Sequence, residues 1–454
     1  DGTYAWGTYY GGAKAEAEYT SAVAVSPVDG SVYLVGGTTS TNNIWSSTTQ
    51  GTSYSGGAGD AFIAKFNPSG VRQWGRYFGG SGDDGRISAS VAVDENGYLY
   101  IAGYTFSTDL PVINAYQSTH GGGTRDLYIA RFDPSNGNTI WATYYGGSND
   151  EPHDYFYSSN LLCAKGGKVT AIAGTNSTGL ASPGAFKVAP DNIDVIIVCF
   201  DVSGIRQWAT YYGGSAGDHG SGCAVDEAGN IYASGRTTFC DGIATVGAYQ
   251  TFHAGSSDAF IAKFSASGSL IWGSYFGGWG QDGLRGPSCA VYSSDGSVYL
   301  AGRLQNVQCG IGTVGAHLPT QPTTNTLNIS IFLAKFCQGG SGCVSGTHAN
   351  PCTSSWSCGV LAYSLSESKP DSVKRPDGLY LVNHPSSQPR LLLPAEAEEG
   401  YEWVLYDVLG RRLQAGQAAV RELHIDLRGY PAGRYMLAIT GRRLWQVVVE
   451  KPAD

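Results

Sequence analysis

The sequence predicts an all-β protein: a five-bladed β-propeller closed by its N-terminal strand and followed by a small Ig-like β-sandwich. Three observations support this fold: a long internal repeat, four short strand patterns in each copy, and a turn-rich, aromatic composition. The 454 residues include 65 Gly and 29 Tyr, and only 14% are charged. The formal net charge of −9 argues against a nucleic-acid partner. No apolar run approaches the roughly 18 residues of a membrane span.

The repeat is the motif Trp-x-x-Tyr-[Phe/Tyr]-Gly-Gly. Its copies are Trp6–Gly12, Trp74–Gly80, Trp141–Gly147, Trp208–Gly214 and Trp272–Gly278. Recurrence at a long, nearly constant spacing indicates one supersecondary unit, copied until the copies bury one another's faces.

Three other apolar runs, separated by turn residues, lie between successive motifs. The third runs are Asp60–Phe66, Asp126–Phe132, Asp194–Phe200, Asp258–Phe264 and Ile331–Phe336. Four short strands per repeat are typical of a propeller blade, and the runs give five blades. No Trp motif follows Phe336, so we expect Trp6–Gly12 to complete the fifth blade and close the ring.

Three stretches carry a family resemblance: Gly56–Phe66, Gly97–Thr105 and Trp141–Gly147. They resemble the SBBP-type bacterial β-propeller repeat. The resemblance covers residues 1–336 and implies the propeller fold, but it says little about activity.

Residues 337–378 are rich in Gly, Ser and Pro and contain Cys337, Cys343, Cys352 and Cys358. We interpret them as a linker stapled by disulfides of undetermined connectivity. A zinc site is the alternative, although the gaps between these cysteines differ from the usual Cys-x₂₋₄-Cys pairs.

Residues 379–454 form the third predicted domain, with strands at Tyr401–Asp407, Leu423–Asp426, Arg434–Thr440 and Trp445–Glu450. Tyr401–Arg411, Ile425–Leu427 and Pro431–Tyr435 resemble the C-terminal sorting domain of type IX secretion substrates. The resemblance implies export by the type IX machinery to the outer cell surface or the medium.

Ten cysteines in an exported chain are expected to pair. Within a blade, the first strand begins where the second ends, which predicts Cys223–Cys240 and Cys289–Cys309. Cys163 and Cys199 lie on the first and third strands of one blade. An intervening strand places them beyond disulfide reach, so we expect both to be free.

An acid stands four residues after each Gly-Gly: Glu16, Asp84, Glu151, Asp218 and Asp282. All should lie at the same end of the channel, where a ring of carboxylates would bind a cation such as calcium, or another ligand. The alternative is that each acid caps its own turn by accepting backbone N–H groups. Because these acids are part of the repeat itself, we favour the capping role and expect no cofactor.

His153, Asp154 and His219 depart from the repeat near one channel mouth and form a candidate metal or acid–base cluster. Five-bladed propellers do include glycoside hydrolases that use channel carboxylates. However, no nucleophile elbow, phosphate loop or paired zinc motif is present, so we do not expect an enzyme.

Two functions from different classes follow. The first is a secreted structural or adhesive surface protein that self-assembles into a filament or layer, its attached C-terminal domain docking on a neighbouring copy. The second is a carbohydrate-binding or glycoside-hydrolase propeller that contacts a surface glycan at the channel mouth. The low charge and the lack of a unique catalytic constellation favour the first.

Overall fold

The computed structural model describes residues 2–46, 53–85, 89–151, 161–238, 242–245, 248–251, 253, 256–278, 281–291, 297–305 and 329–337, plus strands of the C-terminal segment. Only the backbone is described for residues 17–20, 284–288, 290, 291, 305 and 329 and for the C-terminal strands. The chain forms two compact units, Asp1–Thr353 and Ser354–Asp454. In the part of the chain listed above, no helix has the length and apolar character needed to cross a bilayer.

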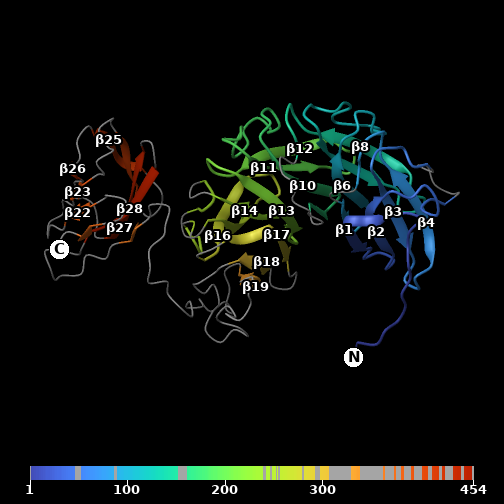
Figure 1. Cartoon of the computed structure of the whole chain (residues 1–454). Helices are drawn as coiled ribbons and strands as arrows, with labels where there is room; N and C mark the ends of the chain where they lie inside the picture. The colour runs from blue at the N-terminus through green and yellow to red at the C-terminus, as the bar shows by residue number, and fades with distance from the viewer. Residues whose placement is uncertain are drawn as a thin grey trace. The chain divides into compact units, whose positions relative to one another are not determined.

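The first unit contains a series of antiparallel sheets in chain order (Figure 1). Sheet 1 is formed by β1 (Glu16–Val25), β2 (Val32–Thr38), β3 (Asp60–Phe66) and β4 (Arg72–Phe78). Sheet 2 is formed by β5 (Ala89–Val93), β6 (Leu99–Thr105), β7 (Asp126–Phe132) and β8 (Thr139–Tyr145). Sheet 3 is formed by β9 (Leu162–Lys165), β10 (Lys168–Thr175), β11 (Asp194–Phe200) and β12 (Arg206–Tyr212). Sheet 4 is formed by β13 (Asp218–Val225), β14 (Ile231–Thr237), β15 (Asp258–Phe264) and β16 (Leu270–Phe276).

Successive sheets are held together by apolar packing, as the predicted runs require. The third strands are buried on both faces: in β3, every residue except Lys65 is buried. The register is the same in sheets 1 to 4, where the residue before the last Phe of the third strand lies opposite the motif Trp. This residue is a cation in Lys65↔Trp74, Arg131↔Trp141 and Lys263↔Trp272, and Cys199 replaces it in sheet 3.

The motif Trp fastens one sheet to the next. The indole N–H groups of Trp74, Trp141 and Trp208 donate to carbonyls in the following sheet at 3.1 Å. Each ring also packs on a turn Gly there; a Cβ at Gly137, for example, would lie 2.9 Å from Trp74. Gly137 has a φ of 72°, so the close approach and the turn both require glycine.

Sheet 5 contains three strands, β17 (Gln281–Val291), β18 (Val298–Gln305) and β19 (Ile329–Phe336). The predicted fourth strand, Trp6–Gly12, is described, but it forms no strand and is not paired with β19. The series of four-stranded sheets therefore agrees with the prediction, whereas closure of the ring by the N-terminal strand is not confirmed.

The disulfide prediction for Cys223 is wrong. Cys223 pairs with Cys163, and their Cα atoms lie 5.4 Å apart. Cys163 is on β9 and Cys223 on β13, the first strands of neighbouring sheets, so the bond crosses a sheet junction. Cys163 is thus not free, whereas Cys199 is free and buried, as expected.

The remaining predicted disulfides are only partly within the described chain. Cys289 is buried, with its Sγ 3.5 Å from the carbonyl of Tyr232. Cys240 and Cys309 lie outside the described residues. Cys337 is disulfide-bonded, and Cys343, Cys352 and Cys358 also lie outside them.

The second unit contains two sheets. The larger has the order β20 (Leu361–Ala362), β28 (Leu444–Lys451), β27 (Gly433–Thr440), β24 (Tyr401–Tyr406) and β25 (Arg412–Ala418). The smaller has the order β21 (Val373–Lys374), β22 (Tyr380–Val382), β23 (Arg390–Leu392) and β26 (Glu422–His424). Each of the four strands predicted here overlaps a strand of the structure.

We expect Cys223→Ser to lower the free energy of unfolding by about 2–5 kcal/mol, because the disulfide closes a long loop in the unfolded chain. Urea titration with and without reductant measures the loss, and Cys199→Ala, which removes a free thiol, serves as the control. Peptide mapping without reduction should recover the Cys163 and Cys223 peptides joined. A linked Cys223–Cys240 peptide would contradict this pairing.

Candidate functional site at the sheet junctions

The five repeated acids are the first candidates for function, and each is bound into a turn. The second Gly of each Gly-Gly donates its N–H to the acid four residues later, as in Gly80 to Asp84 at 2.6 Å and Gly147 to Glu151 at 2.8 Å. Glu16, Asp218 and Asp282 accept in the same way from Gly12, Gly214 and Gly278. The geometry is that of a capped turn, repeated at each junction.

Hydroxyl groups at the end of the second strand complete the caps of Glu16, Asp84 and Glu151. Asp84 accepts from the hydroxyls of Thr105 and Ser107, the latter at 2.7 Å. Glu16 accepts from Thr38 and Ser40, and Glu151 from Thr175. The Asp84 backbone N–H also donates to Gly59 at 2.7 Å. Asp84 therefore ties the end of sheet 1 to the start of sheet 2.

A second carboxylate lies beside four of these acids and was not singled out from the sequence. It belongs to the Asp that opens the third strand: Asp60, Asp126, Asp194 and Asp258. The first Gly of the motif lies against both acids: a Cβ at Gly79 would be 2.7 Å from Asp60 Oδ1 and 2.8 Å from Asp84 Oδ2. Gly146, Gly213 and Gly277 contact the corresponding pairs. The recurrence of Asp at the head of the third run was the available sequence signal.

These acid pairs are buried, and their pKa values are raised. Asp60, Asp84, Glu151 and Asp282 are 0% exposed. Burial and the neighbouring carboxylate raise the pKa of Asp60 to about 7 and that of Asp282 to about 8. Burial likewise raises the pKa of Asp126 and of Asp218 to about 7. At neutral pH, the pairs are therefore partly protonated rather than doubly charged.

The acid pair of sheet 3 also has an ammonium group beside it. Lys187 Nζ lies 2.6 Å from Asp194 Oδ2 and donates to Gly213 O at 2.9 Å. The equivalent residues of sheets 2 and 4 are Gln117 and Gln250, which accept instead from the N–H groups of Gly146 and Gly277. One position of the repeat thus carries either an amide or a cation beside the buried acid.

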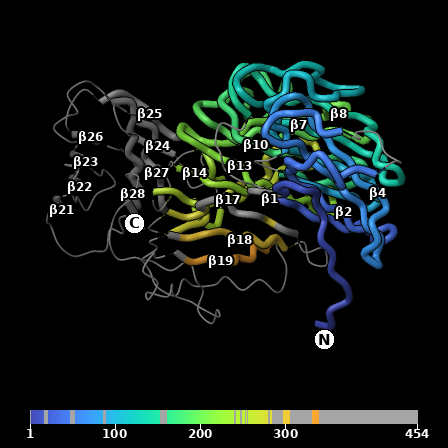
Figure 2. The backbone as a smooth tube through the Cα atoms, turned by 45° about the vertical axis from the view of Figure 1, so that its right-hand side comes forward, coloured from blue at the N-terminus to red at the C-terminus, as the bar shows by residue number. Residues whose placement is uncertain are grey.

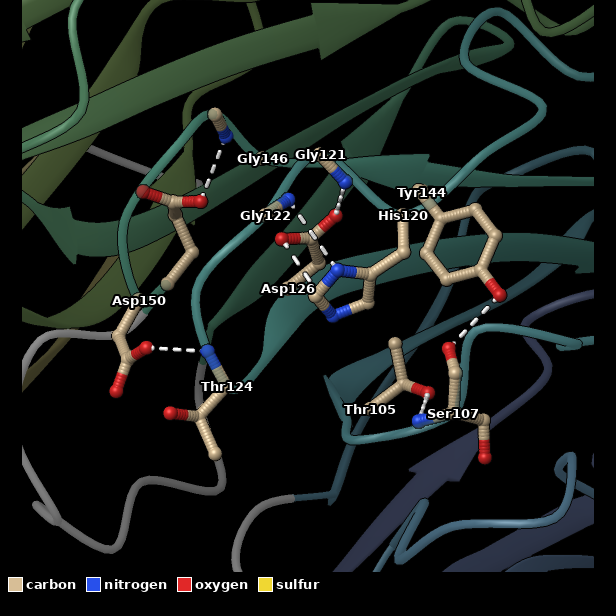
Figure 3. Close-up of polar contacts among 12 residues, drawn as sticks. Thr105, Ser107, His120, Gly121, Gly122, Thr124, Asp126, Tyr144, Gly146 and Asp150 are labelled. Carbon is tan, nitrogen blue, oxygen red and sulfur yellow. Dashed lines mark hydrogen bonds and ion pairs between the residues drawn. The ribbon is translucent and has the colours of Figure 1, made fainter.

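Sheet 2 adds a histidine to this arrangement (Figure 3). His120 Nε2 lies 3.8 Å from Asp126 Oδ1, and its Nδ1 accepts from the N–H of Gly122. Burial lowers the pKa of His120, so the ring is neutral at neutral pH and adds no positive charge beside Asp126. His253 of sheet 4 is 2% exposed, and burial lowers its pKa to about 4.

The predicted His cluster is only partly within the described chain. His219 is on β13 and 9% exposed, whereas His153 and Asp154 lie outside the described residues. Within the described ranges, no three or more His, Cys, Asp or Glu side chains are placed to hold one metal ion. The hydrogen bonds from Gly80 to Asp84 and from Gly147 to Glu151 are those that the capping role requires.

A comparison with protein families supports the predicted repeat. Residues 73–111 and 207–241 match the family model described as the SBBP β-propeller repeat. The chain contains SBBP β-propeller repeats. The Caulobacter vibrioides regulatory protein FlaEY is 27% identical over 284 residues, which cover 56% of this chain and 27% of FlaEY. The match thus spans about a quarter of that relative's length.

Solved structures to which the chain is similar include two carbohydrate-active enzymes and a secretion component. A PL25 ulvan lyase has a TM-score of 0.37 at 12% identity, covering 98% of this chain and 96% of the lyase. NanB sialidase from Streptococcus pneumoniae has a TM-score of 0.33 at 10% identity, covering 64% and 58%. PorZ, a surface component of the type IX secretion system of Porphyromonas gingivalis, has a TM-score of 0.26 at 12% identity, covering 95% and 51%. Scores this low assign no activity to the chain.

We expect the free energy of unfolding to fall as the pH rises from about 4, the usual Asp pKa, to about 8, the pKa of Asp282 in the fold. The sign follows because the folded state holds protons that the unfolded state releases in this range. Asp282→Asn should flatten the profile by up to about 1.4 kcal/mol per pH unit. Urea unfolding at pH 5 and pH 8 measures the difference, with Glu95→Gln, an exposed acid, as control. Stability that rises with pH in this window would contradict the assignment.

Lys187→Met should destabilise the fold by about 3–5 kcal/mol at pH 8, because Asp194 would remain buried without its ammonium partner. The loss should shrink at pH 5, where Asp194 takes up a proton. Lys187→Gln is the matched variant, since Gln fills this position in sheets 2 and 4, and it should cost less than Met. Equal stability of both variants and the wild type at pH 8 would rule out this charge pairing.

Proposed function

We propose that this chain is an extracellular structural or adhesive protein that self-assembles at the cell surface. The chain carries SBBP β-propeller repeats, and the described acids of the repeat are bound into junction caps. A scaffold requires such internal fasteners, whereas a catalytic pair requires a carboxylate that can reach a substrate. The arrangement supports a rigid platform more than a reaction centre.

The observation that carries this proposal is the exposure of apolar side chains on the first and last sheets. Ile331 and Leu333 on β19 are 87% and 74% exposed, and Val23 and Val25 on β1 are 64% and 59% exposed. Ile63, at the position of Leu333 in sheet 1, is 0% exposed because sheet 2 covers it. Apolar faces that are buried between inner sheets but exposed on sheets 1 and 5 favour association with another copy.

The C-terminal unit supports the location. Its resemblance to type IX sorting domains favours export, and a disulfide such as Cys163–Cys223 suits an oxidising compartment. We propose that this unit provides attachment to the secretion machinery or the cell surface, or docks on a neighbouring copy.

One observation favours carbohydrate binding as a second function. Three loops between second and third strands each carry a half-exposed aromatic ring at the same repeat position: Tyr116 (47%), Phe186 (50%) and Tyr249 (48%). The guanidinium of Arg206 lies 4.8 Å from the centre of the Tyr116 ring. Exposed aromatic rings beside polar groups can stack on sugar rings, with His153 and His219 as further candidates.

Negative-stain imaging of the full chain over a range of concentrations tests the proposed function. We expect filaments or layers whose abundance rises with protein concentration, because association at exposed apolar faces follows mass action. Single particles at every concentration would contradict self-assembly. Binding to a glycan array would then be measured, with Tyr116→Ala and Tyr249→Ala as the first variants.

A further inference from the structure

The last sheet lacks the strand that its counterparts possess. In sheets 1 to 4, the third strand pairs on its outer side with a Trp-motif strand, as β3 pairs with β4 and β15 with β16. In the described part of sheet 5, β19 is the last strand. A strand at the edge of a sheet is a template for pairing with another extended segment.

The N-terminal Trp motif is already seated as such a strand would be, but on sheet 1. Trp6 Nε1 donates to Pro68 O at 2.9 Å, which matches the bond from Trp74 to Pro134 in the next sheet. Tyr10 Oη donates to Ile44 O at 2.5 Å, as Tyr212 Oη does to Ile243 O. The segment thus takes the place on sheet 1 that β4 takes on sheet 2.

One side of residues 6–12 is exposed to solvent. Tyr9 is fully exposed, and Trp6 is 38% exposed, whereas Trp74 is 1% exposed. Figure 2 shows this part of the chain leaving sheet 1 as a separate extended tube. Gly12 is close in sequence to Glu16, where β1 begins, so the segment is tethered to its own first sheet.

We propose that residues 6–12 of one copy pair with β19 of a second copy and supply the fourth strand of its last sheet. This proposal rests on the proposed self-assembly and names its interface. Because the donor strand and the acceptor edge lie on different sheets, the contact is heterologous and extends head to tail.

The internal repeats give the register of this pairing. The position of Lys335 is held by Lys65 in sheet 1 and by Lys263 in sheet 4, and both pair with the motif Trp. By this template, Trp6 lies opposite Lys335, and Tyr9 lies opposite Phe332, as Tyr77 does opposite Phe62.

The exposed apolar faces of β19 and β1 are complementary as well. Ala61 and Ile63 of β3 are covered by sheet 2, which includes Ala89 and the partly buried Val91 and Val93. Ile331 and Leu333 hold the equivalent positions on β19, and Val23 and Val25 lie on β1, the counterpart of β5. One contact between copies would therefore bury both exposed end faces.

Two single-function variants test the interface in the full chain. Deletion of residues 1–12 leaves only the acceptor edge, and Ile331→Lys with Leu333→Lys leaves only the donor segment. The side chains of Ile331 and Leu333 are exposed, so the variant with both lysines should fold. Circular dichroism checks that this variant and the deletion variant are folded. In sedimentation velocity, each variant alone should be a monomer, and an equal mixture should stop at about twice the mass of one chain.

Ile205→Lys is the matched control, since Ile205 is 61% exposed and lies in the turn before β12 of sheet 3, away from sheets 1 and 5, and this variant should assemble like the wild type. If the wild type assembles but the mixture stays monomeric, or each variant still assembles alone, strand exchange is wrong while the proposed function stands.

If the wild type is monomeric at every concentration and the deletion variant is less stable than the wild type, residues 6–12 close the ring of their own copy, and both proposals fail.

Discussion

A buried carboxylate that must be supplied with hydrogen-bond donors is the constraint on which the repeat depends. Asp84 takes one donor from Gly80 at the end of sheet 1 and others from Thr105 and Ser107 of sheet 2. Losing one such partner would leave a buried acceptor unsatisfied, which costs about 1–3 kcal/mol. The acid therefore dictates the Gly-Gly before it and the hydroxyl groups after it.

Each sheet is consequently incomplete without its neighbours. The cap acid, the motif Trp and the Cys163–Cys223 disulfide all cross from one sheet to the next. A protein built this way gains stability from each added junction and leaves unsatisfied surface at the ends of the series. The exposed side chains of Ile331 and Val23 lie at these ends, and self-assembly would bury them.

Much of this fold could be predicted because its pattern is repeated. The runs Asp60–Phe66, Asp126–Phe132, Asp194–Phe200 and Asp258–Phe264 are strands with these same bounds. The Cys163–Cys223 disulfide could not be predicted because it joins the first strands of two sheets, and the sequence does not show how closely those strands approach each other. Asp60, which lies beside Asp84, was not predicted as a site residue because its position at the start of a strand was a sufficient explanation for it. Lys187 replaces a Gln of the repeat, but its charge pairing depends on a three-dimensional approach to Asp194.

Native-state hydrogen exchange at Gly80, Gly147, Gly214 and Gly278 tests most directly whether the repeated acids fasten the junctions. Each of these amides belongs to a turn, yet each donates to a carboxylate of the junction cap. We expect their protection to match that of the buried strands, because the caps open only when neighbouring sheets separate. Exchange as fast as in exposed turns would contradict the structural role and leave the acids available for a ligand.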